Sequence, residues 1–153
     1  MKKLLLAVLV LSSTSLFAQK KADDIARLST ETYDFGKVKE NTPPTATITV
    51  TNIGTEPLII EQATPSCGCT VSDYTKAPIA PGKTGTITAT YNAAAVGPIN
   101  KTLTVKFAGA DDPKFVKLTG EVLTPDAYSA YEAAHPAAKK SKKETKETTS
   151  SKS

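Results

Sequence analysis

The chain has 153 residues, a net charge of +4 and only two cysteines, Cys67 and Cys69. The positive charge lies at the two ends. Lys2 and Lys3 lie near the start of the chain, and the last fifteen residues are rich in lysine. Residues 19–138 between them have a net charge of −2. A nucleic-acid-binding domain is expected to carry a basic patch on its body. We therefore expect no nucleic-acid partner.

The first 18 residues are typical of a secretory signal peptide. Lys2 and Lys3 precede a continuous apolar run from Leu4 to Leu11, and Ala18 precedes the expected cleavage site. The run is much shorter than the roughly 20 residues that cross a bilayer. We expect a secreted protein of the periplasm or cell envelope, with no transmembrane segment in the mature chain. Such a compartment is oxidising, which favours disulfides.

Residues 19–27 are expected to form an N-terminal linker, and residues 28–123 the folded domain. Within this domain apolar and polar residues alternate with period two, and turn residues interrupt the alternation. The expected strands, in chain order, are 30–36, 45–52, 58–63, 70–74, 84–92, 99–107 and 114–122. About seven short strands in roughly a hundred residues predict an all-β, immunoglobulin-like antiparallel β-sandwich. A small β-barrel is the alternative, since periodicity does not separate the two.

The composition changes after the last expected strand. Residues 124–138 are expected to be a linker with a short helix before Pro136. Residues 139–153 are rich in Lys, Ser and Thr and predict a disordered tail, because they contain too little apolar surface to order themselves. We expect this tail to solvate the protein. The alternative is a weak contact with an anionic surface.

The cysteine pair lies in the segment Pro65–Thr70, where only Gly68 separates Cys67 from Cys69. An even cysteine count in an oxidising compartment favours a disulfide that clips the loop. Residues two apart have Cα atoms ~5.5–7 Å apart, within reach of such a bond, and glycine would relieve the tight backbone. Two thiolates could instead bind Cu(I) as a metal site. Thiol–disulfide exchange is the third interpretation. Pro65, Ser66, Gly68 and Thr70 are expected to support the loop.

Other residue patterns do not indicate catalysis. The single histidine, His135, lies beyond the folded domain, so a Ser-His-Asp or Cys-His arrangement has no base. Asp111 and Asp112 precede a proline and are expected to be turn residues. We therefore expect no enzymatic activity and no resident cofactor.

Five sequence elements resemble a bacterial secreted domain family of unknown function. They are Tyr33–Gly36 (Y-x-F-G), Asn52–Ile60 (N-x-G-x-x-P-L-x-I), Ser66–Thr70 (S-C-G-C-T), Ile79–Gly82 (I-x-P-G) and Gly120–Val122 (G-x-V). That family is also similar to immunoglobulin-like domains of the major-sperm-protein and ASPM/SPD-2/Hydin type, which serve as binding or scaffolding modules. The resemblance implies a sandwich and supplies no activity.

Together these patterns predict an exported, non-catalytic binding or scaffolding module of the bacterial envelope. Its partner would be a protein or another envelope component, bound along a sheet edge or through the loops near the cysteines. The alternative from a different class is a thiol-active protein, in which Cys67 and Cys69 bind Cu(I) or exchange disulfides.

Overall fold

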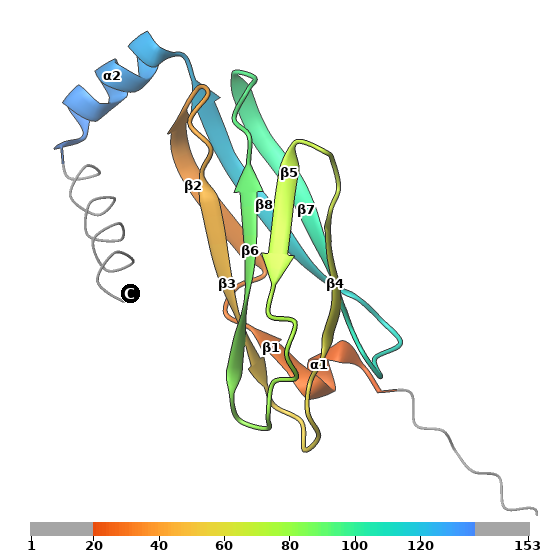
Figure 1. The fold of residues 1–153 in the computed structure, drawn as a ribbon. Coiled ribbons are helices and arrows are strands. Elements are labelled where there is room, and N and C mark those ends of the chain that lie inside the picture. The colour runs from red at the N-terminus through yellow and green to blue at the C-terminus, as the bar shows by residue number, and fades with distance from the viewer. Residues whose placement is uncertain (1–19, 137–153) are drawn as a thin grey trace, which may run out of the picture.

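A computed structural model describes residues 20–136, which form two packed four-stranded sheets (Figure 1). One sheet has the strand order β1-β3-β6-β5 and the other β2-β8-β7-β4. The elements are α1 (Ala22–Ile25), β1 (Ala26–Leu28), β2 (Thr32–Lys39), β3 (Thr45–Asn52), β4 (Ile60–Pro65), β5 (Thr70–Tyr74), β6 (Thr84–Tyr91), β7 (Gly97–Phe107), β8 (Lys114–Leu123) and α2 (Pro125–Ala134). The predicted β-sandwich is confirmed, and the barrel alternative is wrong because the sheets do not close on one another. The signal peptide and the tail fall outside the described residues.

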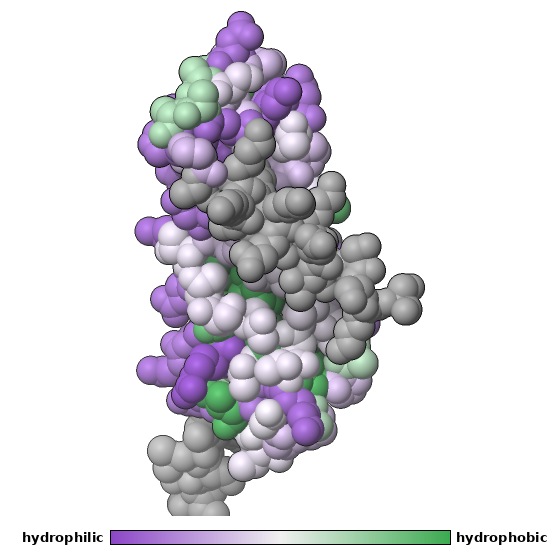
Figure 2. Space-filling view, turned by 90° about the vertical axis from the view of Figure 1, so that its left-hand side faces the viewer, coloured by the Kyte–Doolittle hydropathy of each residue, from purple (hydrophilic) through white to green (hydrophobic). Residues whose placement is uncertain are grey.

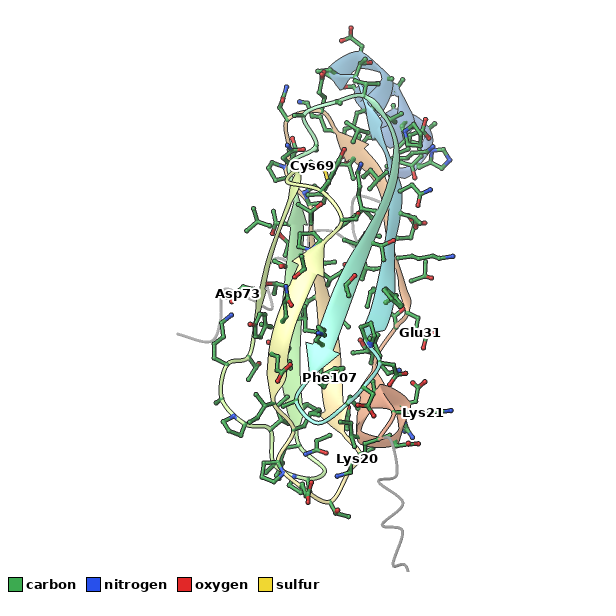
Figure 3. All side chains as sticks on the ribbon, turned by 90° about the vertical axis from the view of Figure 1, so that its right-hand side faces the viewer. Lys20, Lys21, Glu31, Cys69, Asp73 and Phe107 are labelled. Carbon is green, nitrogen blue, oxygen red and sulfur yellow. A yellow bond between two sulfur atoms is a disulfide. The ribbon has the colours of Figure 1, made fainter. Side chains whose placement is uncertain are left out.

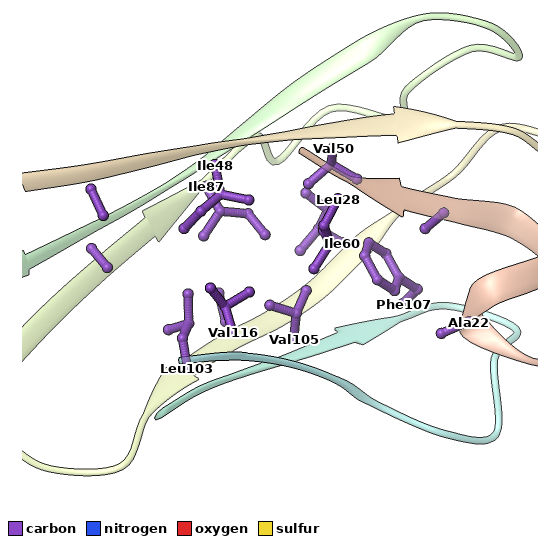
Figure 4. Close-up of a cluster of buried hydrophobic side chains, with 14 of the residues drawn as sticks. Ala22, Leu28, Ile48, Val50, Ile60, Ile87, Leu103, Val105, Phe107 and Val116 are labelled. Atoms are coloured by element: carbon purple, nitrogen blue, oxygen red, sulfur yellow. The ribbon is translucent and has the colours of Figure 1, made fainter. Parts of the chain in front are cut away.

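The period-two alternation of the sequence builds the main core. β3 and β6 pair in register, so Ile48 lies opposite Ile87 on the inward face while the threonines between them point outward. β7 and β8 supply the opposing layer through residues such as Leu103 and Val116 (Figure 4). Each fully buried aliphatic side chain stabilises the fold by about 1.5–3 kcal/mol. The chain contains no tryptophan, so the core consists mainly of aliphatic side chains.

A second, smaller cluster of buried residues lies apart from the main core. It contains Val38, Tyr91, Ala93, Ile99 and Val122. The side chains of Phe35 and Cys69 pack against this cluster while staying partly exposed. The cysteine loop is therefore anchored to the folded body at one of its two cysteines.

The expectation of a linker over residues 19–27 is wrong, because this segment contains α1 and most of β1. The side chains of Ala22 and Ala26 are buried in the main core. The Ala22 amide donates to Oδ1 of Asp112 (2.8 Å), and the Asp111 amide donates to the Lys20 carbonyl (3.1 Å). A three-residue strand is too short to show alternation, so the sequence pattern did not predict β1. The sandwich therefore has eight strands, where about seven were expected.

The sandwich is not antiparallel throughout, because β2 pairs with β8 in parallel. Alternation reports which side chains face inward and carries no information on the direction of a neighbouring strand. The register of this pair shifts at a bulge that contains Gly36. Gly120 faces the bulge with a φ of +150°, and a Cβ there would stand 2.9 Å from the Gly36 carbonyl oxygen. Glycine is required at Gly120 on both counts.

Helix α2 follows β8 directly and lies within the segment expected to be a linker with a short helix. The Thr124 hydroxyl accepts a hydrogen bond from the Ala127 amide (3.3 Å), and Pro125 occupies the first helical turn. Both features favour a helix start at this point. Neither helix in residues 20–136 is long and apolar enough to cross a membrane.

Candidate functional site at the cysteine-bearing end

The cysteine loop, residues 66–69, carries the chain from β4 in one sheet to β5 in the other. Cys67 and Cys69 are joined in a disulfide, with their Cα atoms 5.3 Å apart. Both residues are partly exposed, and Gly68 between them is exposed. Both sulfurs are engaged in the disulfide, so the Cu(I) hypothesis requires prior reduction and stays a prediction.

Gly68 has a different role from the one expected. Its φ is not positive, and a Cβ added there would meet nothing within 4 Å. The tight disulfide therefore forms without the left-handed backbone that only glycine adopts readily. The missing side chain instead leaves the outer surface of the loop uncovered.

The residues beside the cysteines hold the loop through the main chain. The Ser66 amide donates to the Thr102 carbonyl (2.8 Å), and the Thr102 amide donates back to the Ser66 hydroxyl (3.1 Å). Pro65 ends β4 opposite Leu103 of β7. Thr70 is 3% exposed, and its hydroxyl oxygen lies 3.9 Å from Cys67 Sγ. The predicted loop-support residues Pro65, Ser66 and Thr70 thus contact β7 or the disulfide itself.

Two neighbouring loops join the cysteine loop at this end of the sandwich, far from Lys20 at the other end (Figure 3). They are residues 40–44 and 92–96. We call all three, residues 40–44, 66–69 and 92–96, the cysteine-end loops. The Asn92 amide donates to the Cys69 carbonyl (2.9 Å), and the Asn41 amide donates to the Ala93 carbonyl (2.8 Å). A chain of backbone hydrogen bonds therefore connects all three.

The junction between two of these loops is strained. Asn41 has a φ of +56° and Ala93 a φ of +52°, and no other described residue except glycine has a positive φ. Asparagine tolerates this region, whereas alanine does so at a cost of order 1–3 kcal/mol. Ala93 is fully buried in the second cluster, so packing maintains the strained conformation. Strain of this kind gathers at functional sites more often than elsewhere.

The cysteine-end loops present small apolar side chains to solvent. Val96 is 49% exposed. Pro43, Ala94 and Ala95 are also exposed. Sequence analysis missed this group because alanine and proline in a loop produce no periodic pattern.

The nearby sheet edges are less accessible than the loops. β4 and β5 lie at the edges of the two sheets on the same side of the sandwich. The Ser72 hydroxyl donates to the Ala63 carbonyl, and the Tyr74 hydroxyl donates to the Glu61 carbonyl (2.6 Å). These side chains occupy main-chain acceptors of β4 that an added strand would need. Figure 2, which views the molecule from the side of β2 and β3, shows hydrophobic residues only in scattered places.

The opposite end of the sandwich contains two of the five sequence elements noted above. Asn52 is 1% exposed, and its side-chain amide donates to the carbonyls of Glu56 and Ile79, both at 2.7 Å. Its Oδ1 accepts from the Gly54 amide (2.9 Å), and its own carbonyl accepts from Gly82 (2.9 Å). Asn52 therefore joins N-x-G-x-x-P-L-x-I to I-x-P-G. We assign both elements a structural role.

The charged candidates also have structural roles. Asp112 holds the start of α1, as described above. His135 stacks on Tyr131 with ring centroids 4.4 Å apart at the end of α2. In the described part of the chain, no three His, Cys, Asp or Glu side chains come together in a group that could hold a metal.

Two exposed carboxyls have perturbed pKa values, and neither belongs to the cysteine-end loops. The Lys20 ammonium, 2.9 Å from Glu56, lowers the pKa of that carboxyl below its ordinary value. The Tyr74 amide donates to Asp73, and Lys76 lies 3.3 Å away, so the pKa of Asp73 is lowered as well. Both shifts come from surface contacts.

The architecture is that of an immunoglobulin-like β-sandwich. The chain belongs to the family described as "Protein of unknown function (DUF1573)", whose model matches residues 26–122. The expected resemblance to a family of unknown function is thereby confirmed. Among curated proteins, no sequence matches the chain.

Three solved structures illustrate the likeness. The ASH/PapD-like domain 7 of human CEP192 is 11% identical with a TM-score of 0.53, over 80% of this chain and 99% of that domain. A protein of unknown function from Porphyromonas gingivalis W83 is 17% identical with a TM-score of 0.56, over 63% of this chain and 46% of that one. The secreted serine protease VesC from Vibrio cholerae is 15% identical with a TM-score of 0.52, over 72% of this chain and 27% of that one. The chain thus corresponds to less than half of the last two proteins. These likenesses establish the fold alone.

Proposed function

We propose that this chain is an exported, non-catalytic binding or scaffolding module of the bacterial envelope, which holds a protein partner on its cysteine-end loops. The observation that carries the proposal is the hydrogen bond from the Asn41 amide to the Ala93 carbonyl. It joins two loops at the two non-glycine residues with positive φ in the described chain. Ala93 has a backbone conformation that is costly for alanine, and its burial in the second cluster maintains it.

A protein partner suits the chemistry of these loops. Pro43, Ala94, Ala95 and Val96 give these loops exposed side chains without charge, and the buried core of a protein interface is depleted of charged residues. The loops are joined by backbone hydrogen bonds, so little conformational entropy remains to be lost when a partner docks. We therefore expect Val96 and its neighbours to contact the partner directly.

The loops are favoured over strand addition as the binding mode. The Ser72 and Tyr74 hydroxyls occupy carbonyl groups of β4 at one edge. At the other side, β2 carries the Gly36 bulge and the charged residues Lys37 and Lys39. Bulges and edge lysines are features that discourage strand pairing.

Export is part of the same proposal and rests on the leader of residues 1–18. Cleavage after Ala18 would leave a mature chain that starts at Gln19, one residue before the described part. The lysine-rich tail would add a weak contact with an anionic envelope surface. The intact mass of the protein from a periplasmic extract tests this point, and a full-length cytoplasmic product would refute it.

The binding role is tested by site-specific photo-cross-linking in the producing bacterium. We expect a cross-linker at Val96 to give a discrete adduct and one at Ile53 to give none. Ile53 lies at the opposite end of the sandwich and is 39% exposed, so it is a matched control for Val96. The purified partner should then lose binding to an Ala94→Asp/Val96→Asp variant whose circular dichroism is unchanged. Equal adducts at both positions, or undiminished binding, would refute the proposal.

A further inference from the structure

We infer that the Cys67–Cys69 disulfide is a thiol–disulfide exchange site that accepts two electrons from the dithiol of a partner protein. This inference gives the cysteine loop an activity of its own and does not depend on a partner held by the apolar residues. Three observations carry it: the unequal packing of the two cysteines, the hydrogen bonds that hold the loop without the disulfide, and the Thr70 hydroxyl beside Cys67.

The two cysteines are packed differently. Cys69 contacts the second cluster of buried residues, whereas Cys67 is not part of either cluster. The residues on both sides of Cys67, Ser66 and Gly68, are exposed. A Cβ added at Gly68 would meet nothing within 4 Å, so the loop is open to solvent at this residue. An incoming thiolate can therefore reach Cys67 Sγ more readily than Cys69 Sγ, and access is one determinant of exchange rate.

The loop keeps its backbone contacts when the disulfide opens. The Ser66 amide donates a hydrogen bond to the Thr102 carbonyl, and the Asn92 amide donates one to the Cys69 carbonyl. The Thr70 amide donates to the Cys67 carbonyl (3.3 Å), and the Thr102 amide to the Ser66 hydroxyl. None of these bonds uses a sulfur atom. A bridge between residues two apart also closes a very short loop, so it restricts the unfolded chain little. Reduction should therefore leave the sandwich folded, as a reusable exchange site requires.

The exchange is a balanced two-electron transfer. A partner thiolate attacks Cys67 Sγ, the bond to Cys69 breaks, and Cys69 Sγ leaves with the electron pair and takes a proton from water. The partner's second thiolate then attacks the partner's first sulfur in the mixed disulfide and releases Cys67 as a thiolate, which takes a proton from water. The partner becomes a disulfide and is oxidised. The loop becomes a dithiol and is reduced.

Thr70 is positioned to assist the second step. In the disulfide Cys67 Sγ carries no proton, so the contact at 3.9 Å is a hydrogen bond donated by the Thr70 hydroxyl. The same donor would stabilise the thiolate as it leaves, because hydrogen bonding to the charged form favours it. Thr70 is thus a positioning residue, held in place by its burial at the start of β5.

The first test measures whether the bond exchanges. The purified mature chain is equilibrated with an equimolar amount of reduced thioredoxin, then alkylated and weighed intact. We expect more than half of the chains to carry two alkyl groups, with an unchanged circular dichroism spectrum. A chain that stays oxidised in a tenfold excess of reduced thioredoxin would overturn the inference. So would a chain that unfolds on reduction.

The second test assigns the roles. Reaction with oxidised glutathione is followed by mass for Cys69→Ser, which leaves Cys67 as the only thiol, and for Cys67→Ser, which leaves Cys69. We expect Cys67 to react at least tenfold faster. Adding Thr70→Val to the Cys69→Ser variant should move the pH of half-maximal rate upward, whereas Thr47→Val on the exposed face of β3 should not. Equal rates for the two thiols would refute the assigned order of attack, and an unchanged pH profile would refute the role of Thr70.

Discussion

Replacement of Asn52 by alanine tests the structural role given to the end of the sandwich opposite the cysteines. The side chain makes three hydrogen bonds from a buried position: it donates to the Glu56 and Ile79 carbonyls and accepts from the Gly54 amide. Alanine removes all three and leaves the main-chain groups in place. The two loops that Asn52 connects would keep their main-chain hydrogen bonds and the packing of Leu58 and Ile79.

The expected cost follows from these contacts. A hydrogen bond in a folded protein contributes about 1 kcal/mol net, so three lost bonds amount to about 3 kcal/mol. The Ile79 carbonyl still accepts a hydrogen bond from the Leu58 amide (2.8 Å), so it is not left unpaired and adds nothing to this cost. A domain of this size has a total stability of roughly 5–15 kcal/mol. The variant should therefore fold, with a melting temperature lower by roughly 10 °C or more.

Urea unfolding followed by circular dichroism measures the difference. We expect Asn52→Ala to lower the free energy of unfolding by about 3 kcal/mol with an unchanged m-value. Asn100→Ala is the matched control, because Asn100 is exposed on β7 and its replacement should cost less than about 0.5 kcal/mol. If the two variants lose the same stability, the assignment of Asn52 as a structural connector is refuted.

Three further predictions concern other parts of the molecule. Cys67→Ser with Cys69→Ser should lower the free energy of unfolding by no more than about 1.6 kcal/mol, the chain-entropy value for a three-residue loop; a loss above about 3 kcal/mol in urea would contradict it. Gly120→Ala should destabilise by about 2 kcal/mol or more, because φ is +150° and the Cβ would stand 2.9 Å from a carbonyl oxygen; an unchanged melting temperature would refute this. The Glu56 carboxyl has a lowered pKa, so its ion pair stabilises the fold above the ordinary value of 4.5 and is lost as the pH falls through the acid range. In an NMR titration Lys20→Met should raise its midpoint, and an unmoved midpoint would contradict the assigned cause.

The sequence predicted the sandwich well because the alternation of apolar and polar residues in its strands indicates which side chains are buried. In β3 and β6 each outward residue is threonine, and each inward residue is apolar except for Gly85 and Asn52. The pattern could not report β1, since three residues do not establish a period. The pattern also could not predict that β2 runs parallel to β8, because alternation shows which side chains face inward and not the direction of the neighbouring strand.

The candidate site was predicted only in part. Two cysteines two residues apart pointed to the loop and to a disulfide, and the structure places the sulfurs in that bond. The partners of the loop were not visible in the sequence. Asn41 and Ala93 are far from the cysteines along the chain and meet through main-chain groups, which carry no residue signature. The positive φ of Ala93 has no sequence signal, since alanine rarely adopts it.

The two ends of the sandwich solve the same problem in different ways. Both ends must connect strands of two sheets and satisfy the polar groups of the connecting loops. At the Asn52 end the buried Asn52 side chain does so with hydrogen bonds of 2.7 Å to two carbonyls, and the φ of Asn52 is not positive. At the cysteine end the connection uses a covalent bond and a strained alanine. Because the fold has an unstrained solution at one end, the costlier one at the other calls for an explanation beyond folding, and partner binding and exchange both supply it.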